Sequence, residues 1–444
     1  MDFTKEYQQK LTTPEEAVKV VKSGDWVDYS VSLGFPELLD AALAKRKDEL
    51  EDVKIRGYLI LQPIEAVECD PEREHFTYNS WHCSGYERKL CDRGLCNYIP
   101  MVFRNVAAYY ERYLTVNVAM MAVPPMDAHG YFNFSVNNAT ARATLDKADV
   151  VILEINENLP KVYGGFGESI HISEVDMIVE GPHGPLKELP TPAATEIDET
   201  IAKMVVENMR DGSTIQIGIG GMPNAVGQMI AQSDLKDLGI HTELLVDAYL
   251  DMYKAGKITN RLKSIDKNKG VFGFALGSQS LYDWVKENPG LVTAPIDYVN
   301  APETIAQLDN FVSINNCISV DLYGQICAES AGTRHISGTG GQLDFLTGAF
   351  DGKGGQSFIC MTSSFTDKQG NFKSRIVPTF NGDIVTDPRS QGFILVTEYG
   401  LVNLAGLSTW EKAEKLISLA HPDHREDLIR AAEEQKIWRK SNKR

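Results

Sequence analysis

The sequence predicts an α/β protein made of two related open-sheet domains, because its two halves repeat the same order of elements. GDWVDYSVSLGFPELLDAAL begins at Gly24, and GSTIQIGIGGMPNAVGQMI begins at Gly212. Each segment runs from a glycine through an apolar strand, a loop of small residues and a proline into an apolar helix. Strands that alternate with helices favour a mostly parallel sheet, and the repeat of this unit indicates a duplication.

A second match extends the repeat to the next strand. LEDVKIRGYL, residues 50–59, has the pattern of LKDLGIHTEL, residues 235–244, and each reads as a helix exit followed by a strand. The alignment places Tyr58 opposite Glu243. The second domain therefore carries a carboxylate at the position where the first domain carries a phenol.

A third match is a glycine turn that follows a strand. DAHGYF, from Asp127, resembles DKQGNF, from Asp367, and glycine supplies the backbone freedom that such tight turns require. The two turns lie further apart in the sequence than the members of the first two matches. We interpret the larger separation as insertions in the second half.

The boundary between the two domains is expected within LPTPAAT, residues 189–195, where prolines and small residues interrupt the pattern. This places the first domain at residues 1–190 and the second, which carries Glu243, at residues 191–444. A helix is predicted from Ile197 to Met209, and its apolar residues at helical spacing are expected on its buried face: Ile197, Ile201, Met204, Val205 and Val206.

The composition excludes several classes of function. The 444 residues include 61 acidic and 44 basic side chains, a formal net charge of −17, which argues against a nucleic-acid partner because phosphate contacts need clustered Lys and Arg. No window approaches the roughly 20 apolar residues of a membrane span, and the N-terminal residues lack an apolar signal core. We therefore expect a soluble cytoplasmic protein with small-molecule partners and no membrane association.

Seven cysteines are spread through the chain, an odd number that does not suggest a disulfide framework. The tightest group is His82, Cys83, Cys91 and Cys96, but a paired CxxC is missing and the spacing matches no common structural zinc site. The sequence favours buried or loop thiols over a metal site, and we expect no metal.

A glycine-rich turn lies between the strand and the helix of the second repeat, within IQIGIGGMPN, residues 215–224. Glycines let backbone N–H groups approach a ligand, and the helix that follows favours negative charge. By itself such a turn is more often tight packing than a ligand loop. It contains neither a P-loop nor a full dinucleotide fingerprint, so ATP and NAD are poor candidates. Glu243 stands on the next apolar strand, where a charged side chain faces either solvent or a site.

The motifs GIGGMPNAV, IHTELLVDAYLDM, SGTGGQLDF and VPPMDAHGYFNFS resemble the acetyl-CoA hydrolase/transferase family, and in particular its butyryl-CoA:acetate and 4-hydroxybutyrate CoA-transferases. The resemblance covers nearly the whole chain. It implies a CoA-transferase duplication in which Glu243 becomes a glutamyl-CoA thioester. It also implies CoA contacts from the glycine loop and two later backbone positions: Gly218, Gly220, Gly221, Met222, Pro223, Asn224, Ile318 and Gly341.

The chemistry that the resemblance implies is the exchange of CoA between butyryl-CoA and acetate. Glu243 attacks the thioester carbonyl to give an anhydride, the CoA thiolate attacks the glutamyl carbonyl, and an incoming carboxylate reverses both steps. The partners are acyl-CoA and short-chain carboxylates, and no cofactor beyond coenzyme A is expected. Relatives of this kind suggest a homo-oligomer, a dimer or a larger ring.

Four further residues are weaker candidates. The resemblance places Gly165, Phe166 and His171 near the acyl and carboxylate pocket, although an isolated histidine on a strand is more often a structural one. Lys368, on the repeated glycine turn, is a candidate for contact with an anionic group. A basic stretch, residues 251–270, could attract the phosphates of CoA or could form a solvated face.

Three alternatives to a butyryl-CoA:acetate exchange remain open. The acid could be 4-hydroxybutyrate or propionate, or water could resolve the glutamyl intermediate, which would make the protein an acyl-CoA hydrolase. A third possibility, from another class, is a non-catalytic ligand sensor, because a fold does not by itself determine a function.

Overall fold

A computed structural model describes residues 3–190 and 192–438, so Thr191, at the expected domain boundary, lies outside the described residues. The chain divides into two compact units. The first runs up to Pro190 and adds Glu243–Val246 and Val271–Val299, while the remaining described residues form the second. Glu243 is therefore grouped with the first unit.

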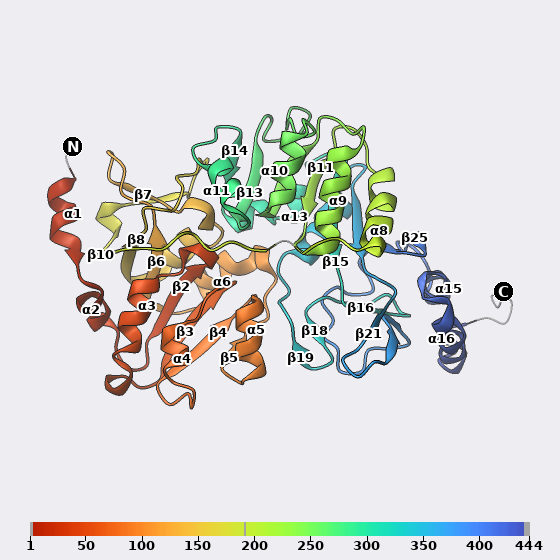
Figure 1. Cartoon of the computed structure of the whole chain (residues 1–444), viewed down its shortest axis with the longest axis horizontal. Coiled ribbons are helices and arrows are strands. Elements are labelled where there is room, and N and C mark those ends of the chain that lie inside the picture. The colour runs from red at the N-terminus through yellow and green to blue at the C-terminus, as the bar shows by residue number, and fades with distance from the viewer. Residues whose placement is uncertain (1–2, 191, 439–444) are drawn as a thin grey trace. The chain divides into compact units, whose positions relative to one another are not determined.

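An eight-stranded sheet, parallel throughout, forms the centre of the first unit (Figure 1). Its central strands are almost continuously buried, as expected for a parallel sheet that is covered on both faces. In sheet order the strands are β1 (Leu11–Thr12), β10 (Met177–Glu180), β8 (Ala148–Ile155), β6 (Val116–Val123), β2 (Trp26–Val31), β3 (Val53–Tyr58), β4 (Phe76–Ser80) and β5 (Cys96–Tyr98).

The other large sheet also has eight strands. At one edge β25 runs antiparallel to β24, whereas β12, β11, β15, β20 and β24 are parallel to one another. In sheet order its strands are β14 (Leu291–Thr293), β13 (Gly270–Ala275), β12 (Gly239–Leu245), β11 (Thr214–Ile217), β15 (Phe311–Asn316), β20 (Gln356–Cys360), β24 (Ile394–Thr397) and β25 (Gly400–Asn403).

The two sheets follow one plan. Counted from β5, the first sheet reads β5-β4-β3-β2-β6-β8-β10-β1, and the second reads β14-β13-β12-β11-β15-β20-β24-β25. In each, the chain visits the first seven strand positions in the same order. The eighth position is taken by β1, the first strand of the chain, in one sheet and by β25, which runs antiparallel and comes last, in the other. The first two sequence matches pair β2 with β11 and β3 with β12, which occupy equivalent positions. The predicted duplication of an open parallel α/β sheet is confirmed.

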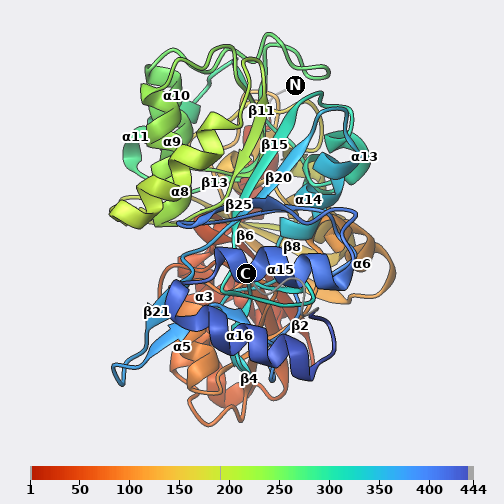
Figure 2. The same ribbon diagram turned by 90° about the vertical axis from the view of Figure 1, so that its right-hand side faces the viewer.

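Helices cover the sheets. In the second unit α8, α9 and α10 lie on one face of β11, β15 and β20, and α13 and α14 lie on the other face (Figure 2). The longer helices are α3 (Glu37–Ala44), α5 (Gly85–Asp92), α6 (Val106–Arg112), α7 (Ala141–Lys147), α8 (Glu196–Glu207), α9 (Gly221–Gln232), α10 (Asp247–Lys254), α11 (Gln279–Val285), α14 (Gln342–Asp351), α15 (Thr409–Leu419) and α16 (Pro422–Glu434); α12 (Ile296–Val299) and α13 (Pro302–Ile305) are single turns.

The helix predicted from Ile197 is α8, which begins one residue earlier. Thr195 caps it, because its Oγ1 accepts a hydrogen bond from the N–H of Asp198 at 3.1 Å while the Asp198 carboxylate accepts one from the Thr195 N–H at 2.9 Å. Ile201 and Val205 are buried as predicted. Ile197 is 41% exposed, so the prediction for this residue is wrong. Ile197 lies on the same face of α8 as Ile201, but the buried part of that face does not extend to the first turn of the helix.

The third sequence match also needs correction. The turns at Asp127, Asp321 and Asp367 share one hydrogen-bond pattern, in which the aspartate Oδ1 accepts from the backbone N–H groups two and four residues later. The turn at Asp127 follows β6, whose equivalent is β15, and the turn that follows β15 is the one at Asp321. The turn at Asp367 follows β20 instead. The turn at Asp321 is therefore the counterpart of the turn at Asp127, and the turn at Asp367 is a third copy. Asp127 and Asp367 lie further apart in the sequence because they are not equivalent.

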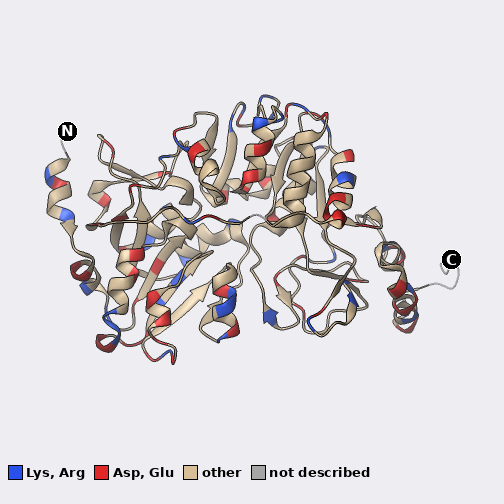
Figure 3. Ribbon diagram, viewed as in Figure 1, with Lys and Arg blue, Asp and Glu red and all other residues tan. Residues whose placement is uncertain are grey.

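Acidic and basic residues are interspersed along the ribbons of both units (Figure 3). Within residues 3–190 and 192–438, every helix is too short or too polar to cross a bilayer.

Candidate active site

Glu243 is the fifth residue of β12 and the only half-buried member of that strand; the other six are buried. On the adjacent strand β13, Gly273 has no space for a side chain, because a Cβ there would lie 2.7 Å from Ile296 Cδ1 and 3.0 Å from the Glu243 carbonyl oxygen. The backbone that carries the carboxylate is thus packed tightly against its neighbours. A side chain anchored on a packed strand is held more firmly than one on a loop.

Tyr58, the repeat counterpart of Glu243, is also its neighbour in space. The Tyr58 side chain is buried, and its hydroxyl lies 3.0 Å from Thr140 Oγ1. Burial raises the pKa of Tyr58 well above its usual range, and the negative charge of Glu243 raises it further. Tyr58 is therefore a neutral phenol at pH 7 and adds no second negative charge beside the carboxylate.

Aromatic rings surround Tyr58 within the first unit. Its ring lies 5.8 Å from Trp81 and 5.7 Å from Phe103, and Phe103 in turn lies 6.4 Å from Phe274 on β13. Offset and edge-on contacts of this kind add to the stabilisation from burial alone. The sequence does not indicate this cluster, because its rings come from separate segments of the chain.

The glycine loop lies between β11 and α9, as predicted. Gly220 has φ of +124°, a conformation that favours glycine, and a Cβ there would lie 3.4 Å from Asn316 Nδ2. A Cβ at Gly218 would lie 3.3 Å from Asn315 Oδ1. Gly221 begins α9, Met222 and Pro223 are buried, and Asn224 is half-buried.

Polar side chains fix the end of β11, just before the glycine loop. The backbone N–H of Ile217 donates to the hydroxyl of Tyr249, on α10, at 2.8 Å. Gln216 exchanges two hydrogen bonds with Asn315, at 3.2 Å and 3.0 Å. Because these groups are buried and satisfied, they hold the loop entrance in one arrangement.

Ile318 and Gly341 lie in the second unit. The Ile318 N–H donates to the Cys327 carbonyl at 2.8 Å, and its carbonyl accepts from Arg375 Nη1 at 3.0 Å, so both of its backbone polar groups already have partners in the protein. Gly341 is the N-cap residue of α14.

The weaker candidates are dispersed. Lys368 is exposed on the Asp367 turn of the second unit, whereas the other three lie in the first unit. Gly165 has open space around it. His171 ends β9 (Ser169–His171), where its Nδ1 accepts from the Ser173 N–H at 3.2 Å and its ring packs against Phe3 and Tyr131. These contacts give His171 a structural role.

Phe166 lies at a cavity of about 740 Å³ in the first unit, a volume typical of small-molecule sites. Thr140, the hydrogen-bond partner of Tyr58, also lines it. The walls include apolar, aromatic and charged groups: Thr140, Arg142, Phe166, Pro295, Asp297 and Tyr298.

The basic stretch after β12 is partly used by the fold. Lys263 is buried and donates to the carbonyls of Ile240 and Lys269 at 2.9 Å and 2.7 Å, and burial lowers its pKa to about 8. Arg261 forms an ion pair with Asp237 at 2.6 Å. These two side chains have structural roles, so the stretch is not simply a solvated basic face.

The duplicated parallel sheets place the chain in the structural class of the CoA-transferases. The structure of a 4-hydroxybutyrate CoA-transferase from Porphyromonas gingivalis matches with a TM-score of 0.80 and 31% identity over 98% of this chain and 100% of that one. The crystal structure of RipA from Yersinia pestis matches with a TM-score of 0.90 and 37% identity over the same shares of the two chains.

The particular family follows from the sequence models. The N-terminal domain of acetyl-CoA hydrolase/transferase matches residues 1–190, and its C-terminal domain matches residues 277–432. The butyryl-CoA:acetate CoA-transferase of Anaerostipes caccae is 52% identical over 100% of both chains. The chain belongs to the acetyl-CoA hydrolase/transferase family.

The contact between Tyr58 and Thr140 can be measured with a double-mutant cycle. Tyr58→Phe and Thr140→Val each remove one partner of a buried hydrogen bond, so we expect the double variant to be more stable than the sum of the single losses predicts. The coupling should be about 0.5–1.5 kcal/mol, measured by denaturant unfolding. Purely additive losses would show that the two hydroxyl groups do not interact.

Proposed function

We propose that this protein is a CoA-transferase that exchanges CoA between butyryl-CoA and acetate through a glutamyl-CoA thioester at Glu243. The observation that carries the proposal is the position of Glu243, half-buried on a packed strand beside a buried, neutral Tyr58. Family membership and the 52% identity with a butyryl-CoA:acetate CoA-transferase support the choice of substrates.

The reaction has two half-reactions, and each consists of two successive nucleophilic attacks on a carbonyl carbon. A carboxylate oxygen of Glu243 attacks the thioester carbonyl of butyryl-CoA, a C–O bond forms, the C–S bond breaks, and CoA leaves as the thiolate. The thiolate then attacks the glutamyl carbonyl of the mixed anhydride and releases butyrate. Acetate attacks the resulting glutamyl-CoA and reverses the sequence, which yields acetyl-CoA and regenerates Glu243. The balance requires no oxidant, reductant or ATP.

The glycine loop is the proposed donor site for CoA and for the oxyanion. Gly218, Gly220 and Gly221 follow β11, which is the sheet neighbour of β12, and their small size leaves the backbone N–H groups accessible. An N–H aimed at a developing oxyanion contributes roughly 3–4 kcal/mol to transition-state stabilisation. Met222, Pro223, Asn224, Ile318 and Gly341 complete the proposed CoA site.

The cavity lined by Phe166 and Thr140 is the proposed binding site for the short-chain acid. Gly165 and Lys368 are weaker candidates for contact with the substrates. No catalytic cofactor beyond coenzyme A is proposed.

The seven cysteines, all in the described part of the chain, form no disulfides, which supports a reducing compartment such as the cytoplasm. A homo-oligomer is proposed from the family resemblance.

Removal of the nucleophile tests the proposal. Glu243→Gln should lower kcat for butyryl-CoA:acetate exchange at least about 1000-fold, because an amide cannot form the anhydride. Glu243→Asp keeps the charge but shortens the side chain, and we expect a loss of about 100-fold, as for a reacting atom displaced by about 1 Å. Glu199→Gln, on the exposed surface of α8, is the matched control and should retain full activity.

The same assay separates transfer from hydrolysis. Butyryl-CoA consumption should require acetate and should produce one acetyl-CoA for each butyryl-CoA lost. Consumption at the same rate without acetate would identify an acyl-CoA hydrolase. A Glu243→Gln variant with activity within tenfold of the wild type would contradict the covalent role.

The glycine loop can be tested at Gly220. Gly220→Ala places a Cβ where φ is +124° and near Asn316, so the loop must shift. We expect kcat/KM for butyryl-CoA to fall about 10- to 100-fold, because a donor displaced from the reacting groups loses much of its effect. Gly406→Ala is the control, since φ at Gly406 is +74° and the space around it is open. Equal losses in the two variants would show that backbone strain alone is responsible.

A further inference from the structure

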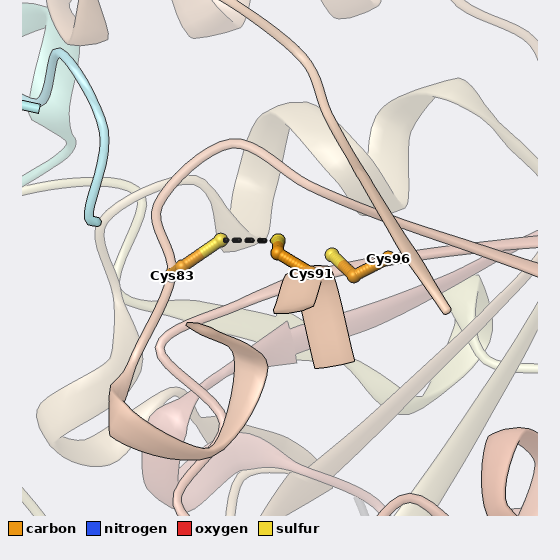
Figure 4. Close-up of side chains that lie close together, drawn as sticks. All are labelled: Cys83, Cys91 and Cys96. Atoms are coloured by element: carbon orange, nitrogen blue, oxygen red, sulfur yellow. Dashed lines mark hydrogen bonds between the residues drawn. The ribbon is translucent and has the colours of Figure 1, made fainter. Parts of the chain in front are cut away.

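Three cysteine side chains converge in the first unit, away from Glu243 in the sequence. Cys83 precedes α5, Cys91 lies in its last turn, and Cys96 begins β5. The Sγ atoms of Cys83 and Cys91 are 3.7 Å apart, and all three Sγ atoms lie within 4.8 Å of one another (Figure 4). The sequence spacing had favoured separate buried thiols, because it matches no common zinc motif.

The local fold brings the three sulfur atoms together. Ser84 and Glu87 form a capping box that fixes the start of α5, next to Cys83, with N–H to oxygen distances of 2.8 Å and 3.2 Å. After α5, Gly94 has φ of +74° and its N–H donates to the Cys91 carbonyl at 3.0 Å. This tight return places Cys96 beside the helix end that carries Cys91.

The distances fit a thiophilic cation. Tetrahedral zinc with Zn–S bonds of about 2.3 Å separates its sulfur ligands by about 3.8 Å. The pair Cys83 and Cys91 already has this separation, and the third sulfur needs only a small approach. Three thiolates form a ligand set that selects soft or borderline cations such as Zn²⁺ and Cu⁺ over Mg²⁺ or Ca²⁺.

Charge favours the divalent ion. Cys83 and Cys96 are 3% and 8% exposed, so thiolates at these two positions are largely shielded from water. Buried negative charge is costly unless it is compensated. Zn²⁺ offsets two of the three thiolate charges, whereas Cu⁺ offsets one. Cys91 is only half-buried, so the fourth position of a tetrahedron can be taken by water on its side.

We propose that Cys83, Cys91 and Cys96 form a zinc site that fastens the segment between β4 and β5. The site ties the residues before α5, the end of α5 and the first residue of β5 to one ion. The segment between β4 and β5 begins at Trp81, whose ring centroid lies 5.8 Å from that of Tyr58. Metal binding at this position stabilises the wall of aromatic rings around the candidate active site, without contact with the substrates.

Metal titration of the full-length protein tests the site. Protein reduced and stripped of metal should bind one Zn²⁺ per chain in competition with a chromophoric chelator, and Co²⁺ should give a sulfur-to-cobalt charge-transfer band. Cys91→Ser, Cys83→Ser and Cys96→Ser should each weaken zinc binding at least about tenfold, as the loss of a ligand requires. Cys69→Ser is the matched control, because Cys69 is half-buried in the same unit and lies outside the group.

The folding of the variants is checked by circular dichroism without metal. Cys91→Ser is the most informative, because a half-buried position tolerates the change best. Zinc should raise the melting temperature of the wild type and of Cys69→Ser but not that of Cys91→Ser. Binding well below one equivalent, binding unaffected by Cys91→Ser, or binding of Cu⁺ but not of Zn²⁺ would each overturn the proposal.

Discussion

The proposed chemistry depends on one structural constraint: the carboxylate of Glu243 is carried by a strand whose other members are all buried. The backbone of Glu243 is fixed, because Gly273 on the adjacent strand packs against it with no space for a side chain. In the proposed reaction this carboxylate first attacks a thioester carbonyl and is then attacked at its own carbonyl carbon, so a fixed position lowers the barrier to both steps. The glycine that permits the close packing is therefore as much part of the site as the glutamate.

Duplication explains how one half of the molecule acquired the carboxylate. The two sheets share the order of seven of their eight strands, and β3 and β12 occupy equivalent positions. In the first copy the position holds Tyr58, which is buried, aromatic and neutral; in the second it holds Glu243. The negative charge of Glu243 raises the pKa of Tyr58, so the residues at the two equivalent positions interact electrostatically.

The sequence alone was enough to predict the helices and strands that follow from local patterns. The strand-loop-helix repeat identified β2, β11, α3 and α9, and the alignment brought Tyr58 and Glu243 to equivalent places. The third match failed because one turn motif, an aspartate that binds its own following backbone, occurs three times, and a local pattern cannot tell which copy is equivalent. Ile197 failed because periodicity gives the buried face of a helix but not how far along the axis burial extends.

The parts that could not be predicted depend on long-range packing. The spacing of Cys83, Cys91 and Cys96 matches no motif, and only the path from α5 into β5 brings their sulfur atoms together. The ring cluster around Tyr58 combines residues from three distant segments, and nothing in their local sequences indicates the contact. The structural use of Lys263 and Arg261 likewise depends on partners outside the basic stretch.

Trapping of the intermediate tests the central claim most directly. The protein is incubated with butyryl-CoA in the absence of acetate, treated with borohydride, and analysed by peptide mass spectrometry. The covalent account predicts that the Glu243 thioester is reduced to an alcohol and that activity is lost irreversibly. An unmodified Glu243 together with full activity after treatment, or a modification at a different residue, would contradict it.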